Sequence, residues 1–190
     1  MLCDPTRVGI IVGHHPESKG ARFEIEGVER GEYDIWKPFA RELARTFKSE
    51  EMEGVVIERP NPRPDEALGR KIQRANLDFA FELHFNAVRS ASVSGTLMIY
   101  RDEHGGSKRL AEVFQNLTKQ ELGLRNRGTV PRSDLGIIRH TPESLPLILC
   151  EPAFGSNPSD VLTLLSELPD LARAYREGAR KFTDAVSKDA

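Results

Sequence analysis

The feature that most constrains the fold of this chain is an alternation of short apolar runs with longer segments of helical periodicity. The first apolar run, residues 7–14, follows a proline and predicts a strand. Apolar residues between Trp36 and Phe47 then recur at the spacings i, i+3, i+4, i+7, i+8 and i+11, as they do on one face of a helix. Since Pro38 fits a helix within its first turn, the helix is predicted to start near Asp34, with Glu32 just ahead of it.

The alternation continues to the end of the chain and predicts its fold class. Further strands are predicted at residues 54–58, 79–85, 95–100, 136–139 and 145–151, and further helices at 65–76, at 107–122 and in two segments that follow Asn157 and separate near Pro169. Residues 15–31 and 123–136 show no clear period and are predicted to be irregular. This order predicts an α/β fold with a twisted, mostly parallel sheet of about six strands flanked by helices. At this length we expect one domain, residues 1–190.

Composition and charge exclude several classes of protein. The net charge of −2, with acids and bases interspersed, gives no reason to expect binding to nucleic acid or to an anionic membrane surface. No segment approaches the roughly 20 apolar residues of a membrane span, and the first residues do not form a Sec signal peptide. We therefore expect synthesis in the cytoplasm, with release or export by another route if the protein acts outside. Cys3 and Cys150 are too few for a disulfide framework, and Cys150 is expected to be a buried thiol.

Four polar residues stand at places where a reaction site could form. His14, His84 and Glu151 each lie at the end of a predicted strand, and Glu32 precedes the first helix. Because sites in parallel sheets gather beyond the carboxyl ends of the strands, we expect the three strand-end residues to share one site. Two imidazoles and one carboxylate are a common ligand set for a catalytic zinc, and the fourth residue would be a free carboxylate able to move a proton. This combination is typical of a metal-dependent hydrolase.

Each of these residues also has a simpler interpretation. A single histidine is more often structural than a metal ligand, and Glu32 could merely stabilise the start of a helix through the helix dipole. Asn157 is better explained as a helix cap than as a site residue. Glu151 is harder to explain in this way, because a carboxylate leaving a buried strand needs a partner. A structural zinc is disfavoured, since closed structural sites use cysteine clusters that this chain lacks.

With these residues in view, the chain resembles the zinc-dependent N-acetylmuramoyl-L-alanine amidases of the amidase-3 family, through motifs that occur in order over residues 7 to about 185. The matching segments are Gly13-His14, Glu32 in Gly-Glu-Tyr-Asp, Arg70 and Arg74-Ala75-Asn76, Leu83-His84-Phe85-Asn86-Ala87, Ser94-Gly95-Thr96, Arg127-Gly128, and the stretch from Pro146 through Glu151 and Phe154 to Asn157. The chain departs from the family at Glu82, where serine is usual, at Pro152, and in its Gly-His-His start. None of these departures removes one of the four residues.

The resemblance implies a reaction and a role for each residue. His14, Glu32 and His84 would bind Zn²⁺, and Glu151 would take a proton from water and pass it to the leaving amine. The substrate would be peptidoglycan, at the amide between N-acetylmuramic acid and L-alanine, and Arg139 or a loop arginine would meet carboxylates of the stem peptide. The alternatives are a zinc-dependent peptidase or deacylase acting on another amide, and a non-catalytic wall-binding module. The intact set of four residues argues against the module. A phage lysin, an exported bacterial enzyme and the catalytic domain of a larger protein all fit the sequence, which predicts no oligomeric state.

Overall fold

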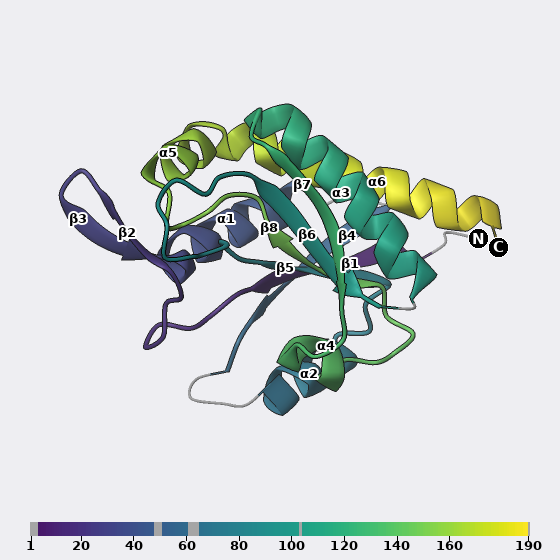
Figure 1. The fold of residues 1–190 in the computed structure, drawn as a ribbon. Coiled ribbons are helices and arrows are strands. Elements are labelled where there is room, and N and C mark those ends of the chain that lie inside the picture. The colour runs from purple at the N-terminus through teal and green to yellow at the C-terminus, as the bar shows by residue number, and fades with distance from the viewer. Residues whose placement is uncertain (1–3, 48–50, 61–64, 103, 190) are drawn as a thin grey trace.

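A six-stranded sheet between two layers of helices forms the protein in the computed structural model, which describes residues 4–47, 51–60, 65–102 and 104–189 (Figure 1). Its strands are β1 (Thr6–Val12), β4 (Met52–Glu58), β5 (Phe79–Leu83), β6 (Thr96–Arg101), β7 (Asn126–Arg132) and β8 (Leu147–Glu151). Their order in the sheet is β4-β1-β5-β8-β6-β7, and only the β6–β8 pair is antiparallel. The prediction of a mostly parallel sheet of about six strands is confirmed.

The helices cover the two faces of this sheet unequally. They are α1 (Glu32–Thr46), α2 (Asp65–Arg74), α3 (Gly105–Leu122), α4 (Gly136–His140), α5 (Pro158–Ser166) and α6 (Leu168–Asp189). Helices α3 and α6 lie on one side of the sheet and α2 and α4 on the other (Figure 1). The larger core cluster contains Trp36 of α1, Phe81 of β5 and Tyr175 of α6, and a smaller cluster joins the opposite sheet face to α2 and α4. Because both faces are covered, the central strands read as continuous apolar runs.

Alternation along β5 decides which way its polar residue faces. Phe79, Phe81 and Leu83 belong to the larger cluster, whereas Ala80 belongs to the smaller one. Successive side chains of a strand point to opposite faces, so Glu82 shares the α2 and α4 side of the sheet with Ala80.

A β-hairpin replaces the irregular structure that we predicted for residues 15–31. Strands β2 (Arg22–Ile25) and β3 (Val28–Gly31) pair antiparallel and project from the body of the protein (Figure 1). The two residues that connect them, Glu26 and Gly27, have φ values of 50° and 78°, as the twist of a two-residue hairpin turn requires. Charged residues dominate the hairpin, and for this reason its apolar alternation is weak in the sequence.

The strand predicted at residues 136–139 is wrong, because this segment forms the short helix α4. A short apolar pair such as Ile137 and Ile138 fits either a strand or a helix, and here both side chains are buried in the smaller core cluster. The Arg101 guanidinium donates to the carbonyl of Ile138 at 2.9 Å, at the carboxyl end of this helix. The sixth strand is β7 instead, which lies in the segment predicted to be irregular. It is an edge strand, and because its side chains are mostly exposed it has no apolar alternation. Its position at the edge also explains why it can contain Pro131.

Predictions about particular residues had mixed outcomes. Helix α1 begins at Glu32 and not near Asp34, so Pro38 lies in its second turn. The Asp34 carboxylate accepts a hydrogen bond from the Gly31 amide at 3.0 Å, which stabilises the earlier start. The burial of Cys150, the Asn157 cap of α5 and the break between α5 and α6 are confirmed.

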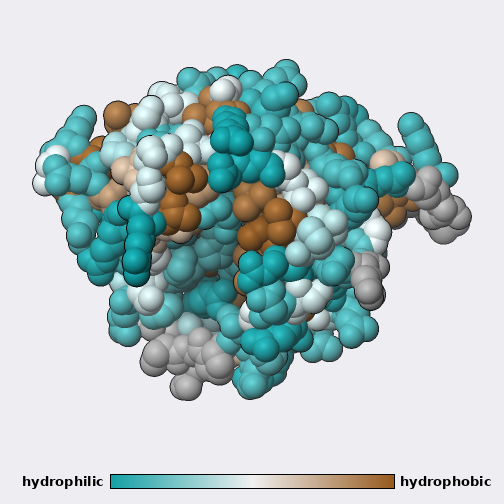
Figure 2. Space-filling view, in the orientation of Figure 1, coloured by the Kyte–Doolittle hydropathy of each residue, from teal (hydrophilic) through white to brown (hydrophobic). Residues whose placement is uncertain are grey.

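The surface is mostly polar on the face shown in Figure 2, where apolar residues occur in small groups. Among the described residues, no helix combines the length and the apolar character that crossing a bilayer requires.

Candidate active site

His14 lies directly beyond the end of β1, where the backbone turns sharply. The Gly13 amide still donates to the Leu83 carbonyl of β5 at 3.2 Å, and His14 then adopts a left-handed conformation with a φ of 64°. Such a conformation is uncommon for a residue other than glycine, and it often marks a functional position. A Cβ atom on Gly13 would lie 2.8 Å from Nδ1 of His84, so the close approach of the two histidines depends on glycine here.

Glu32 is buried at the start of α1, and the backbone around it supplies hydrogen bonds to both of its carboxylate oxygens. Oε1 accepts from the Ala21 amide at 2.7 Å, and Oε2 accepts from the Phe85 amide at 2.9 Å. These contacts join the residue before β2, the start of α1 and the segment that follows β5. They fix the carboxylate in one orientation, because the carboxylate cannot rotate without losing a charge-assisted hydrogen bond.

His14, Glu32 and His84 bring one potential metal-binding atom each to a common point. Oε2 of Glu32 lies 3.2 Å from Nε2 of His14 and 3.3 Å from Nδ1 of His84, and all three ligand atoms lie within 4.8 Å of one another. Two ligands of a tetrahedral zinc with bonds of about 2.0–2.1 Å lie about 3.3 Å apart. The donor set and its spacing therefore fit a zinc ion held by two imidazoles and one carboxylate, with further coordination positions free.

Gly20 packs directly against this cluster, at a position where a side chain would not fit. Gly20 has a φ of 79°, and a Cβ atom added to it would lie 2.6 Å from Nε2 of His14 and 2.7 Å from Cδ of Glu32. Any residue larger than glycine would press on two of the three candidate ligands.

The protonation of the cluster follows from its charges. Burial opposes ionisation of Glu32, but its hydrogen bonds to His14 and His84 lower the pKa of this carboxyl to about 2. Burial likewise opposes the charged form of His84, but the carboxylates of Glu82 and Glu32 raise the pKa of this imidazole to about 10. The cluster thus holds a concentration of negative charge that attracts a proton or a metal cation.

Glu151 lies beside the cluster at the end of β8, the strand adjacent to β5. Leu83 pairs with Cys150 in register, and the His84 amide donates to the Cys150 carbonyl at 2.9 Å. Since Leu83 and Cys150 both face the larger core, His84 and Glu151 are neighbours on the opposite face. Burial raises the pKa of the Glu151 carboxyl above its usual value, and the nearby Glu32 carboxylate adds to this effect.

Sequence reasoning missed the residue that contacts His84 from the other side. Oε2 of Glu82 lies 3.0 Å from Nε2 of His84, and Arg59 donates to Oε1 of Glu82 at 2.8 Å. The pattern Glu-x-His in a strand could have revealed the first contact, because residues two apart lie on the same face. The second contact joins β5 to the residue that follows β4, far away in the chain, and has no local pattern.

The arginines expected to meet substrate carboxylates, Arg139 or one in the loop, do not gather at one place in the structure. Arg139 lines a cavity of about 580 Å³ with Arg101, and none of the three candidate ligands lines this cavity. The guanidinium carbon of Arg127 lies 5.1 Å from the centre of the Phe154 ring. Arg132 is paired with Asp134, and its charge also lowers the pKa of Glu151, although less than burial raises it.

Together, the fold and the site define a class of protein: an α/β protein with a candidate hydrolytic metal centre at the carboxyl edge of its sheet. The sequence matches the family described as N-acetylmuramoyl-L-alanine amidase over residues 8–181, and the chain therefore belongs to this family. No curated protein sequence matches the chain.

Solved structures of similar fold include two with the same description and an endolysin catalytic domain. An N-acetylmuramoyl-L-alanine amidase from Clostridium difficile 630 superposes with a TM-score of 0.82 at 23% identity, covering 96% of this chain and 98% of the other. The amidase AmiC2 of Nostoc punctiforme gives a TM-score of 0.79 at 22% identity, covering 94% and 97%. The catalytic domain of the CD27L endolysin, which targets Clostridia difficile, gives 0.73 at 23% identity, covering 93% and 97%. At these identities the structural matches establish the shared fold.

Proposed function

We propose that this chain is a zinc-dependent amidase that cleaves the bond between N-acetylmuramic acid and L-alanine in peptidoglycan, with residues 1–190 acting as one catalytic domain. The observation that carries the proposal is the convergence of His14, Glu32 and His84 on one point, in a chain of the amidase family. Its place of action would be the bacterial cell wall, reached after release or export.

Each of the three candidate ligands would bind the metal through one atom. His14 would bind through Nε2, His84 through Nδ1 and Glu32 through Oε2, because these atoms face one another. Zinc bound there would supply Lewis-acid polarisation of the amide carbonyl and would acidify a water molecule. The backbone amides of Ala21 and Phe85 would keep the Glu32 carboxylate aimed at the metal.

Glu151 would move the proton. Its side chain neighbours His84 on the same face of the sheet, and its raised pKa makes it a better proton acceptor than an ordinary carboxylate. As the amide bond breaks, the same carboxyl group would donate this proton to the leaving nitrogen of L-alanine and return to its starting state.

The experiment is mass spectrometry of purified peptidoglycan of defined chemotype after treatment with the protein, with and without a chelator. Stem peptides that begin with a free L-alanine, lost on chelation and restored by zinc, are the expected result. Cleavage within the stem peptide would instead identify a zinc peptidase. Absence of both cleavage and bound zinc would contradict the proposal.

A further inference from the structure

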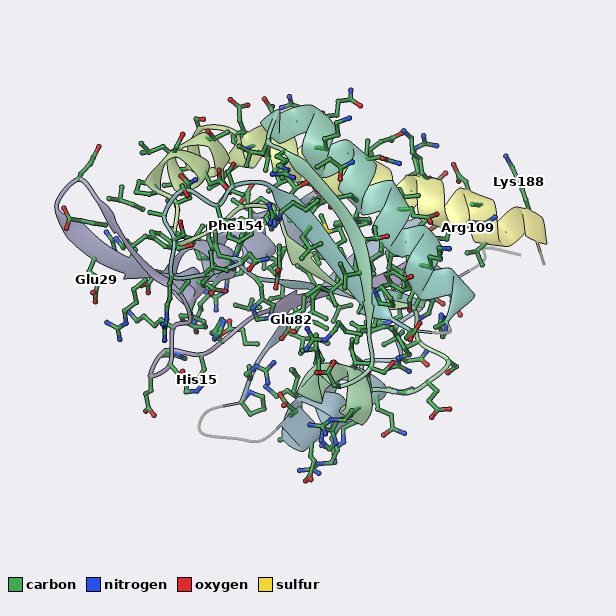
Figure 3. All side chains as sticks on the ribbon, in the orientation of Figure 1. His15, Glu29, Glu82, Arg109, Phe154 and Lys188 are labelled. Carbon is green, nitrogen blue, oxygen red and sulfur yellow. The ribbon has the colours of Figure 1, made fainter. Side chains whose placement is uncertain are left out.

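Glu82 is a buried carboxylate with no place in the reaction described above. It is 1% exposed and lies in the centre of the protein on the α2 and α4 side of the sheet (Figure 3). An ionised carboxylate at such a depth is costly unless both of its oxygens find partners. Its partners therefore indicate what it does.

The two oxygens of Glu82 face in different directions. Oε2 meets Nε2 of His84 at 3.0 Å, and Oε1 accepts from Nη2 of Arg59 at 2.8 Å. Arg59 follows the end of β4, and its Nη1 atom also pairs with Asp65 at the start of α2. A chain of charged groups thus leads from α2 through Arg59 and Glu82 to the imidazole ring of His84.

The contact with Glu82 determines which nitrogen of His84 is available to a metal. Both ring nitrogens face carboxylates, which can only accept hydrogen bonds, and a metal bound to the ring would replace the proton of one of them. Glu82 lies on the side of the ring away from the other candidate ligands, so it would accept the remaining proton from Nε2, and Nδ1 would offer its lone pair to the metal. Nδ1 is the atom that faces Oε2 of Glu32, at 3.3 Å. A carboxylate bound to the distal nitrogen of a ligating histidine fixes the ring orientation and strengthens its binding to the metal.

We infer that Glu82 is a positioning residue for the metal centre, which holds His84 in the tautomer that binds through Nδ1, and that Arg59 anchors Glu82 in this role. The inference rests on the proposed function insofar as it requires that His84 be a metal ligand. Arg59 and Glu82 are coupled, because removing either would leave the other, largely buried, with one charged partner in place of two.

The test measures zinc affinity by competition with a chromogenic chelator in the wild-type protein and in two variants. Glu82→Met keeps the side-chain length but removes the acceptor, and it is expected to weaken zinc binding by about 10–100-fold. Glu82→Gln keeps an acceptor oxygen without the charge and is expected to give a smaller loss. Glu53→Gln is the matched control: Glu53 also pairs with an arginine, Arg7, but at the opposite end of the sheet, and zinc affinity should not change.

A second readout reports the tautomer directly. In the zinc-loaded wild type, long-range ¹H–¹⁵N spectra of the histidines should show His84 with a proton on Nε2 and none on Nδ1. In Glu82→Met this Nε2 proton should exchange faster with water. Thermal unfolding of the metal-free variants shows whether they fold, and Glu82→Ser, with a smaller polar side chain, replaces Glu82→Met if the latter does not fold.

Three outcomes would overturn the inference. Wild-type protein that binds no zinc would remove the metal site itself, and with it the proposed function. Zinc bound with the His84 proton on Nδ1, or an unchanged zinc affinity in folded Glu82→Met or Glu82→Ser protein, would overturn the role of Glu82 alone.

Discussion

Two carboxylates lie at the same edge of the sheet, Glu32 and Glu151, and their surroundings differ in nearly every respect. Glu32 accepts hydrogen bonds from two backbone amides and lies within reach of two imidazoles, and the pKa of its carboxyl is lowered to about 2. Glu151 lies at the end of a strand, and among the described residues nothing donates a hydrogen bond to its carboxylate. Burial raises its pKa.

This difference shows how one chemical group can serve two purposes. A carboxyl that remains ionised at any working pH is suited to bind a cation, whereas one whose proton is held more tightly is suited to transfer it. Pairs of carboxyl groups whose pKa values are pushed apart by their surroundings are typical of active sites. The partners of the two groups produce the difference here. The hydrogen bonds of Glu32 with His14 and His84 lower the pKa of its carboxyl despite its burial, and it lies at the N-terminus of α1. At the end of β8, burial dominates and raises the pKa of Glu151.

The largest expected effect comes from Glu32→Gln. The variant should lose both zinc and activity, because a neutral amide cannot replace an anionic ligand between two histidines. It should also lower the free energy of unfolding by about 1–3 kcal/mol, since one of the amide donors of Ala21 or Phe85 loses its acceptor. Metal analysis and urea unfolding of the purified variant check both effects. Stoichiometric zinc in Glu32→Gln would mean that this carboxylate is not a ligand.

Glu151→Gln should separate proton transfer from metal binding. Turnover should fall by about 10²–10⁴-fold, because a glutamine cannot accept the proton from water, whereas zinc content should remain as in the wild type. Release of stem peptides and metal content are measured on the same preparation. Near-normal turnover would remove Glu151 from its assigned role.

Gly20→Ala should weaken zinc binding without replacing a candidate ligand. The added Cβ would lie 2.6 Å from Nε2 of His14, so zinc affinity should fall, and the strained φ of 79° should cost about 1–3 kcal/mol of stability.

Gly27→Ala is the matched control, because Gly27 has a nearly identical φ of 78° but no atom within 4 Å of an added Cβ. It should show the backbone strain alone, with zinc affinity preserved. Equal zinc affinities in the two variants would show that the close packing of Gly20 does not constrain the metal site.

The smallest effect is the difference in titration between the two carboxylates in metal-free protein. Carboxyl ¹³C spectra should show Glu32 titrating near pH 2 and Glu151 at a higher pH than an ordinary glutamate. Because the pKa of Glu32 is lowered on folding, its contribution to stability is present above about pH 4.5 and is lost as the pH falls toward 2. Similar titration midpoints for both groups would contradict the comparison.

Much of the fold and of the candidate site can be predicted from local patterns. The apolar runs mark where β1, β5 and β8 end, and parallel strands bring their carboxyl ends to one edge, so His14, His84 and Glu151 were expected there. The patterns failed where burial did not favour one conformation. Ile137 and Ile138 fit a strand or a helix equally well, and the exposed strand β7 has no apolar alternation.

By itself, the sequence determined five of the six strands of the main sheet, most of the helices and the residue types at the strand ends, because hydrophobic periodicity is a local property. Only the tertiary structure decided what surrounds those residues. The amides that hold Glu32 come from Ala21 and Phe85, and the arginine that holds Glu82 comes from beyond β4. Such contacts join segments far apart in the chain, and they exist only once the strands have paired and α1 and α2 have packed against the sheet.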